Sequence, residues 1–369
     1  MSFRLTPVGF DDLPGWRDDD PTAVIEAMRR CHRHVSTVKP YRAGSLGIAV
    51  DDLLPAFSAS SADVDDAEGA RAFFERQFVP FRISPDGGSG FVTAFYEPEI
   101  HVRAEADEIY RYPLYRRPAD LIDIDDANRP DGMDPYFAFG LSKDGEVSEY
   151  PDRRAIEQGY LAGRGLEIAY AKSKVEVFFV HVQGAARLVF PDGKRRGVTY
   201  SGKSGHYFSP IGKLLIDRGD IDAATVSMMS IRDWLEAHPD QVDEVLWHNR
   251  SFIFFREADV EDERLGPIAA AKVSLEPGRS LAVDRLIHTF GVPFYVASPS
   301  LTRLDDGKPF QRLMLALDTG SAIVGPARGD IFTGSGYDAG ERAGAVRNIA
   351  DFYVFVPRAA AARFGHAEG

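Results

Sequence analysis

The sequence predicts a mainly β fold with a few helices, and two observations support this fold class. After residue 90, most apolar segments are short and are separated by Gly, Pro or Asp. Helical periodicity is confined to a small number of segments. Many short strands with few helices favour β-barrel architectures over a doubly wound α/β sheet. At 369 residues the chain exceeds one ordinary hydrophobic core, so we expect two domains.

Two helices are expected in the first hundred residues. Apolar residues recur at helical spacing over residues 24–31, directly after an Asp-Pro pair that is typical of a helix start. A second helix is expected over residues 70–78, ending before a proline. Cys31 lies on the apolar face of the first helix and is the only cysteine, which excludes an intramolecular disulfide and a thiolate metal cluster.

Strands dominate the remaining prediction. The segments GFVTAFYEP (residues 90–98) and VEVFFVHVQG (residues 175–184) are expected to be strands, and PDG at residues 191–193 marks a turn. Two helices follow, over residues 210–218 and 228–238, each bounded by Gly or Pro. Further short apolar runs predict strands at residues 252–255, 293–297, 312–317 and 352–356.

Charge and hydropathy restrict the partners. The net charge of −13 repels a phosphate backbone, so we expect no nucleic acid partner. The first residues lack the apolar run of a signal peptide, and no stretch of about 18 apolar residues occurs elsewhere. The chain is therefore expected to be soluble. We assume a monomer, because the sequence leaves the oligomeric state undetermined.

The densest group of unusual residues spans Leu313 to Gly336, where Asp318 and Asp330 each lie at the edge of an apolar segment among several glycines. Glycine lets the backbone approach a ligand closely, so an acid in this setting can project into a cleft. The alternative interpretation is that both aspartates cap turns. The LDTGS sequence around Asp318 also resembles the aspartic proteases, which need two carboxylates sharing one proton.

The sequence predicts no metal site and no cofactor. The nine histidines are scattered and form no HExxH pattern. His181 lies in an apolar run and is interpreted as a structural residue. The glycine-rich segment GSGYDAGERAG lacks the lysine of a phosphate-binding loop, so a nucleotide is not expected.

Several motifs in one order then resemble the membrane-bound lytic murein transglycosylase A family, from about residue 10 to residue 357. Residues 93–98 read TAFYEP, where the family has Thr-Gly-Tyr-Tyr-Glu-Pro, and residues 181–184 read HVQG. The stretch SGKSGHYFSPIGKLLIDRGDI, beginning at Ser201, is similar to the family's Gly-Lys-Asn-Gly-His segment and the helix after it. Residues 281–357 resemble the family's three-aspartate module, with the aspartates matched by Asp284, Asp318 and Asp330.

The resemblance implies a fold with two domains. Residues 1–98 and 249–369 would form a double-psi β-barrel catalytic domain that includes the three-aspartate module. Residues 99–248 would form an inserted, β-barrel-like domain that provides the other wall of a glycan groove.

The resemblance also implies a reaction. A lytic transglycosylase, a lyase acting on polysaccharide, cleaves the β-1,4 bond between N-acetylmuramic acid and N-acetylglucosamine in peptidoglycan glycan strands and leaves a 1,6-anhydro end. The sugar's own C6 hydroxyl attacks, so one carboxyl suffices as acid and then base, and Asp330 matches the family's acid. Its pKa must then be raised, which apolar neighbours (Ile323, Ile331 and Phe332) and the charge of Asp318 could achieve. A hydrolytic glycosidase, a silent glycan-binding protein and an aspartic-type protease are the alternatives.

The residues expected to bind the glycan are polar or aromatic side chains in the matched motifs. They are Thr93, Phe95, Tyr96, Gln183, Lys203, Tyr207 and Asp284. Core packing is the alternative for the aromatic residues, and an ion pair with Arg285 is the alternative for Asp284.

The sequence also departs from the family pattern. Ala94, Ala185-Ala186 and Ser204 replace the usual residues and are expected to lie along the groove. The family implies a place in the periplasm or on the outer-membrane side of the envelope, although no signal peptide or lipid-anchoring cysteine is visible.

Overall fold

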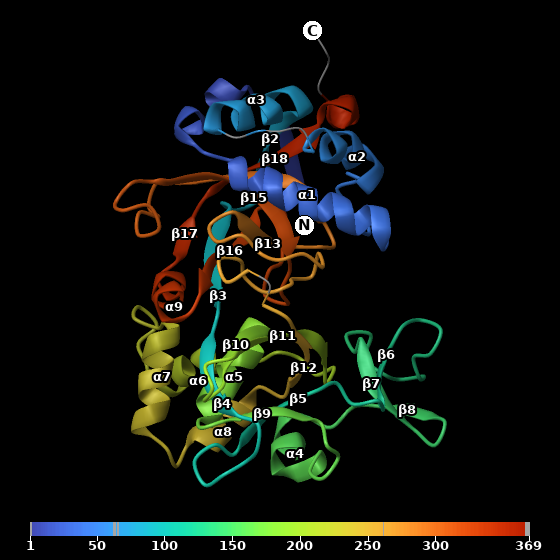
Figure 1. Ribbon diagram of the computed structural model, residues 1–369, viewed down its shortest axis with the longest axis vertical. Coiled ribbons are helices and arrows are strands. Elements are labelled where there is room, and N and C mark those ends of the chain that lie inside the picture. The colour runs from blue at the N-terminus through green and yellow to red at the C-terminus, as the bar shows by residue number, and fades with distance from the viewer. Residues whose placement is uncertain (1, 62–63, 65, 261, 366–369) are drawn as a thin grey trace. The chain divides into compact units, whose positions relative to one another are not determined.

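The computed structural model describes residues 2–61, 64, 66–260 and 262–365 (Figure 1). The chain forms two compact units, and the mainly β prediction is confirmed. Unit 1 combines Met1–Tyr96 with Asp262–Gly369, whereas unit 2 is Glu97–Glu261.

Unit 1 is built on a nine-stranded sheet. Its strands, in spatial order, are β1 (Phe3–Pro7), β2 (Phe78–Pro85), β18 (Asp351–Pro357), β14 (Pro293–Ser298), β15 (Phe310–Asp318), β13 (Ser280–Val283), β16 (Arg328–Ser335), β3 (Phe91–Glu97) and β17 (Arg347–Ile349). The short strand β13 runs parallel to β15 and antiparallel to β16. Within the described residues the hydrogen-bonded order does not close, so β1 and β17 are end strands.

Helices pack on several strands of unit 1 (Figure 1). Helix α1 (Thr22–Thr37) packs against β15, α2 (Val50–Ala59) against β18, and α3 (Ala67–Gln77) against β2. The predictions of α1 and α3 are confirmed, and Cys31 is fully buried in α1 as expected. Helix α2 was not predicted, because Pro55 lies inside it. The sequence also gave no signal for α9 (Tyr337–Gly344), whose two glycines have low helix propensity.

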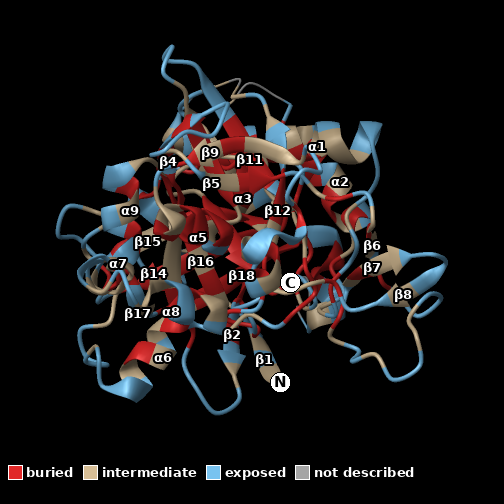
Figure 2. Ribbon diagram, turned by 90° about the horizontal axis from the view of Figure 1, so that it is seen from below, coloured by how far each residue is buried: buried red, intermediate tan, exposed pale blue. Residues whose placement is uncertain are grey.

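Short helical turns complete unit 1. They are η1 (Phe10–Asp12), η2 (Trp16–Asp18) and η4 (Arg358–Phe364). The Trp16 ring lies 5.8 Å from the Phe355 ring and 5.8 Å from the Tyr295 ring, between centroids, and its Nε1 donates to Glu75 Oε1 at 2.8 Å. These aromatic contacts hold the η1–η2 segment against β14 and β18. The buried residues of the unit concentrate on the strands (Figure 2).

Unit 2 contains a six-stranded sheet and a three-stranded sheet. The larger has the order β12 (Ile253–Ala258), β11 (Arg195–Lys203), β10 (Ala185–Val189), β4 (Glu99–Arg103), β9 (Glu167–Ala171) and β5 (Tyr112–Tyr115). The smaller is β6 (Leu121–Asp123), β7 (Phe139–Lys143) and β8 (Glu146–Ser148). One isolated bridge, Arg116 to Phe255, joins the region after β5 to β12. The predicted boundary at residue 249 comes too early, because β12 pairs with β11 and so belongs to unit 2.

One helix of unit 2 was predicted as a strand. The helices of this unit are α4 (Arg153–Ala155), η3 (Ile156–Tyr160), α5 (Lys174–Gln183), α6 (Ile211–Arg218), α7 (Met228–Ala237) and α8 (Val242–His248). The segment predicted as a strand is α5, which Ser173 caps at its start and left-handed Gly184 ends. Val177 and Val180 face one apolar cluster, and Phe178 faces another. A helix buried on several sides gives a continuous apolar run, which periodicity cannot distinguish from a buried strand. The predictions of α6, α7 and the turn at residues 191–193 are confirmed.

Two ion pairs of unit 2 contain deeply buried side chains. Glu97 and Arg187 form an ion pair at 2.8 Å, with side chains only 2% and 6% exposed. Arg153, 1% exposed, contacts Glu157 at 3.1 Å and His181 Nδ1 at 3.1 Å. Burial lowers the pKa of His181 well below its usual value, so its ring is neutral. His181 is therefore a structural residue, as the sequence predicted.

Candidate active site

Strand register brings Asp318 and Asp330 to either side of one residue. Ala282 on β13 lies opposite Asp318 on β15 and opposite Asp330 on β16. Residues directly opposite one another in a sheet project from the same face, and neighbouring strands are about 4.8 Å apart. The backbones of the two aspartates are therefore about 10 Å apart across the sheet. Two acids separated in sequence by a glycine-rich loop thus share one site.

Asp330 is half-buried and has one hydrogen-bonding side-chain partner among the described residues. Its neighbours Ile331 and Phe332 are fully buried. Thr93 Oγ1 donates to Asp330 Oδ1. Burial raises the pKa of Asp330, whereas the Thr93 hydrogen bond and the Arg328 charge act in the opposite direction. Among the described residues, Asp330 Oδ2 has no hydrogen-bond partner.

Asp318 is also an acid of raised pKa. Burial raises the pKa of Asp318 to about 6, and the charge of Asp330 adds to the rise. Backbone N–H groups of Ala270 and Thr319 oppose the shift, and the Ala270 nitrogen lies 3.2 Å from Asp318 Oδ1. Both carboxyls therefore have the property that acid catalysis near neutral pH requires.

Asp284 holds the loop between the two acids. Its carboxylate is 8% exposed and accepts the backbone N–H groups of Leu286 at 3.0 Å and Gly325 at 2.9 Å. Next to it, His288 Nε2 donates to the carbonyl oxygen of Pro326 at 2.8 Å, and burial lowers the pKa of His288 to about 4. The partners of Asp284 are backbone amides, so the alternative of an ion pair with Arg285 does not describe its surroundings.

The other predicted residues of unit 1 differ in exposure. Thr93 contacts the acid directly. The half-buried Phe95 ring lies 5.3 Å from the Phe332 ring, between centroids. Tyr96 is 9% exposed and packs on Gly340, where an added Cβ would lie 2.8 Å from the tyrosine ring. Both aromatic rings therefore contribute to packing, the alternative that the sequence left open.

Two predicted residues of unit 2 meet at a pair of tyrosines. The Tyr136 and Tyr207 rings stack with centroids 3.7 Å apart and an interplanar angle of 14°; we call this pair the tyrosine stack. Lys203 Nζ lies 4.6 Å from the Tyr136 ring centroid and donates to its hydroxyl at 3.1 Å. Tyr207 donates to Asp134 Oδ2 at 2.8 Å and remains 50% exposed. The sequence missed Tyr136 and Asp134, although an aromatic residue within the turn-rich DGMDPYF segment was a usable signal.

The remaining positions of interest in unit 2 lie elsewhere. Gln183 is the last residue of α5 and is half-buried. Ala186 and Ser204 are fully buried; Ala186 lies in the apolar core of unit 2, and Ser204 Oγ accepts the Phe252 N–H at 3.0 Å. The expectation that these two replacements line a groove is therefore wrong, because their side chains face the interior of unit 2.

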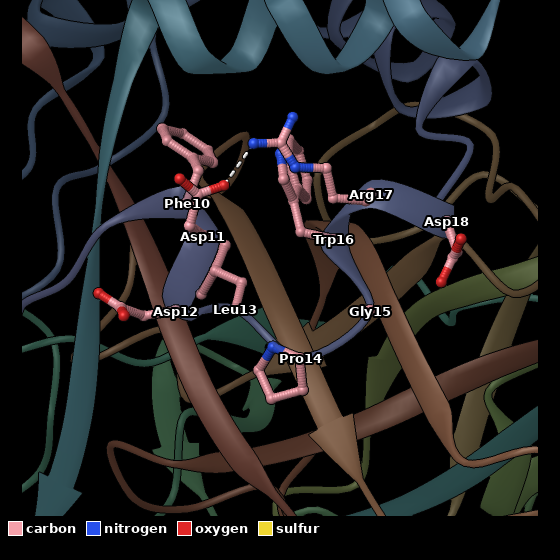
Figure 3. Close-up of a pocket in the computed structure, with 9 residues that line it drawn as sticks. All are labelled: Phe10, Asp11, Asp12, Leu13, Pro14, Gly15, Trp16, Arg17 and Asp18. Atoms are coloured by element: carbon pink, nitrogen blue, oxygen red, sulfur yellow. Dashed lines mark hydrogen bonds and ion pairs between the residues drawn. The ribbon is translucent and has the colours of Figure 1, made fainter.

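A pocket on unit 1 lies away from the two acids. It is lined by residues Phe10 to Asp18, and Figure 3 shows the Arg17 side chain turned toward the Asp11 carboxylate, with which it forms an ion pair. Through Trp16 the segment contacts β14, which is three strands from β16 in the sheet order. The pocket therefore has no part in the chemistry of Asp330.

The described residues contain no group of three or more His, Cys, Asp or Glu side chains placed to hold a metal ion. None of the described helices combines the length and the apolar character needed to cross a lipid bilayer.

Comparison with known proteins identifies the family. Residues 91–256 match the family model of the MltA specific insert domain, and residues 279–356 match that of the 3D domain. The structure superimposes on a membrane-bound lytic murein transglycosylase from Agrobacterium tumefaciens with a TM-score of 0.93 and 62% identity, covering 99% of this chain and 100% of that one. The chain belongs to the membrane-bound lytic murein transglycosylase A family.

More distant members of the family extend this result. The membrane-bound lytic murein transglycosylase A of Escherichia coli K12 is 34% identical over 257 residues, which are 68% of this chain and 61% of that protein. A crystal structure of the E. coli protein with bound chitohexaose has a TM-score of 0.68 and 26% identity, and the match covers 97% of this chain and 95% of that one. This chain therefore aligns with less than two thirds of the length of the curated E. coli relative.

Membership of the transglycosylase family replaces the aspartic protease interpretation of LDTGS. The aspartate of that motif is Asp318, at the end of β15. Sequence reasoning found both acids of the site but missed Arg328, whose Nη2 donates to Thr93 Oγ1 at 2.7 Å. Its position two residues before Asp330, on the same face of a strand, was the available signal.

Proposed function

We propose that this chain is a lytic transglycosylase that cleaves the β-1,4 bond between N-acetylmuramic acid and N-acetylglucosamine in peptidoglycan. The observation that carries the proposal is Asp330: a half-buried acid of raised pKa, within the 3D domain match, with Oδ2 free of partners among the described residues. The names of the relatives support the reaction, and the chitohexaose bound to the E. coli protein supports a glycan substrate.

The first step is protonation of the leaving group. The Asp330 carboxyl gives its proton to the glycosidic oxygen, and the bond between that oxygen and C1 of the muramic acid breaks. The departing sugar leaves with a new hydroxyl, and positive charge develops at C1. Burial favours the protonated acid that this step requires.

The second step closes the anhydro ring. The C6 hydroxyl oxygen of the same muramic acid bonds to C1, and its proton passes to the Asp330 carboxylate. The acid is thereby restored and no water is consumed. One carboxyl acts as acid and then as base, in contrast to the two carboxylates of ordinary glycosidases.

Asp318 and Asp284 support this acid in different ways. Near neutral pH, Asp318 carries negative charge on the same face of the sheet, which stabilises positive charge at C1 and keeps the proton on Asp330. Asp284 fixes the loop that joins the two acids through its hydrogen bond to Gly325. We assign Asp284 a positioning role.

We propose that glycan binding involves both units. Thr93, Phe95 and Tyr96 lie on β3, next to the strand of Asp330. In unit 2 the exposed tyrosine stack and Lys203 offer an aromatic face and polar groups, the combination that binds sugar rings. Gln183 is assigned to the same role because it matches a family motif.

The finer architecture and the location are also proposals. We propose that the nine-stranded sheet is the double-psi barrel of the catalytic domain; the parallel β13–β15 pair is consistent with this, because a simple meander has none. We further propose that the protein acts in the cell envelope, where its substrate lies.

The test uses purified protein and isolated murein. Wild type and Asp330→Asn are incubated with murein, and the soluble products are analysed by mass spectrometry for ends that lack one water. The expected result is anhydro ends from wild type and none from Asp330→Asn, with retained thermal unfolding. Asp351→Asn is the matched control, because Asp351 forms a surface pair with Arg82.

Other outcomes would select other functions. Release of reducing ends would identify a hydrolase. Binding of murein without release would identify a glycan-binding protein. Either result would overturn the transglycosylase proposal.

A further inference from the structure

The Arg328 side chain is fixed next to the acid. It lies two residues before Asp330 on β16, so both side chains are on one face of the strand. Nη2 donates to Thr93 Oγ1 at 2.7 Å, and Nη1 donates to the carbonyl oxygen of Gly329. Its Cζ lies 5.5 Å from the Phe91 ring centroid. These contacts, all within unit 1, hold the half-buried guanidinium in one position.

Donor and acceptor can be assigned in both hydrogen bonds that link Arg328, Thr93 and Asp330. A guanidinium has only donors, so its bond to Thr93 uses a lone pair of the hydroxyl oxygen. The single hydroxyl proton of Thr93 is then left for Asp330 Oδ1. Since Oδ1 accepts this bond, a proton carried by Asp330 resides on Oδ2.

We propose that Arg328 is a positioning residue: acting through the Thr93 hydroxyl, it directs the acid proton of Asp330 to Oδ2, the oxygen that has no hydrogen-bond partner among the described residues. The inference rests on the proposed transglycosylase function. The Oδ2–H bond breaks when the glycosidic oxygen takes the proton, and Oδ2 later accepts the C6 hydroxyl proton. Arg328 gains and loses no proton, and no other reactant is needed.

The arrangement also predicts a pH effect with a definite sign. The Thr93 hydrogen bond and the Arg328 charge both lower the pKa of Asp330, against the effect of burial. Removing either group therefore raises that pKa. Because the first step needs protonated Asp330, the alkaline limb of kcat/KM moves to higher pH in both variants. A residue that only stabilised the fold would not move this limb.

The experiment is a double-mutant cycle on wild type, Arg328→Met, Thr93→Val and the double variant, with soluble murein fragments. Arg328→Met lowers kcat about tenfold to a hundredfold and changes KM less than about twofold, because it frees the Thr93 hydroxyl to rotate. In the Thr93→Val background the same change lowers kcat less than about twofold. Arg328→Lys and Thr93→Ser each restore part of the loss.

The control is Arg82→Met on β2, which removes an arginine that pairs with Asp351 far along the sheet order. It leaves kcat and the pH profile unchanged. Thermal unfolding of each variant shows whether it is folded. If Arg328→Met does not fold, the cycle is run with Arg328→Ala, which removes the same donor.

The outcomes separate this inference from the proposed function. Wild type without anhydro ends would overturn the function itself. An active wild type with an unchanged Arg328→Met kcat and alkaline limb would overturn only the inference. An equal loss in both Thr93 backgrounds would also overturn it, because Arg328 would then act independently of Thr93.

Discussion

Two ion-paired acids of unit 2 contrast with the two acids of the candidate site in unit 1. In unit 2, Glu97 is paired with Arg187 at 2.8 Å, and Glu157 contacts Arg153 at 3.1 Å and Lys174 at 2.7 Å. In unit 1, the hydrogen bonds of Asp318 and Asp330 come from backbone amides and one hydroxyl. Glu97 and Glu157 therefore have cationic partners, whereas Asp318 and Asp330 lack an ion pair at hydrogen-bond distance among the described residues and have a raised pKa.

The largest effect on activity is expected at Asp330. Its substitution lowers kcat without lowering the stability of the fold. Asp330→Asn removes the acid and lowers kcat about a thousandfold. The free energy of unfolding is unchanged or higher, since a buried acid of raised pKa destabilises the folded state at neutral pH. Product release and chemical denaturation measure the two quantities. A marked loss of stability in Asp330→Asn would show that Asp330 stabilises the fold, as the ion-paired acids of unit 2 do.

At Arg187 we expect a loss of stability without a loss of activity, the reverse of the result expected for Asp330→Asn. Arg187→Met leaves the Glu97 carboxylate buried without its guanidinium and lowers the free energy of unfolding by about 3–5 kcal/mol. The activity of the folded fraction is unchanged. Chemical denaturation checks this, with Glu97→Met/Arg187→Met as the matched variant that recovers most of the stability. A stable single variant would contradict a structural role for the pair.

A smaller effect is expected from Asp318 on the pH dependence of stability. Its folded pKa of about 6 exceeds the ordinary value of 3.8, so the folded state binds the proton more tightly. The resulting stability is fully present below pH 4 and is lost as pH rises toward 6 and just above. Asp318→Asn removes about 2 kcal/mol of this dependence, measured by denaturation at pH 4 and pH 7. If stability changed equally with pH in wild type and in Asp318→Asn, the pKa of Asp318 would not be raised in the folded state.

The smallest effect is expected at the tyrosine stack. Tyr136→Leu removes one ring of the stack and raises KM about fivefold, with kcat within about twofold. Tyr200→Leu, an exposed tyrosine of β11 outside the stack, is the matched control. Kinetics on murein fragments give both constants. A change in kcat at Tyr136 would contradict a role of the tyrosine stack in binding alone.

The sequence predicted the elements with clear punctuation. Helix α6 ends at the left-handed Gly219, and α7 begins at the capping Ser227, so local chemistry fixed both. The strand prediction for α5 was wrong because the helix is buried on several sides, which only tertiary packing decides. The limit of unit 2 was also missed, since the pairing of β12 with β11 is not a local property.

The sequence predicted the two acids of the candidate site but not the contacts between distant residues. Asp318 and Asp330 stand out in the sequence because apolar strands and glycines flank them. Two contacts of the candidate site join residues that are far apart in the sequence. Thr93 and Asp330 are 237 positions apart, and Tyr136 and Tyr207 are more than 60 apart. Such pairs arise from strand order and loop packing, which spacing along the chain does not encode.

The position of Ala282 between the two aspartates limits which changes of sequence the site can accept. Because β13 pairs with the strands of both aspartates, their separation is set by strand register and not by the length of the loop from residue 319 to residue 327. A change in the length of that loop would leave this register intact as long as the hydrogen bond from Gly325 to Asp284 is kept. Position 282 is more restricted, since a larger side chain there would grow between the two carboxyls. A small side chain at position 282 is thus a condition for keeping the two acids at this spacing.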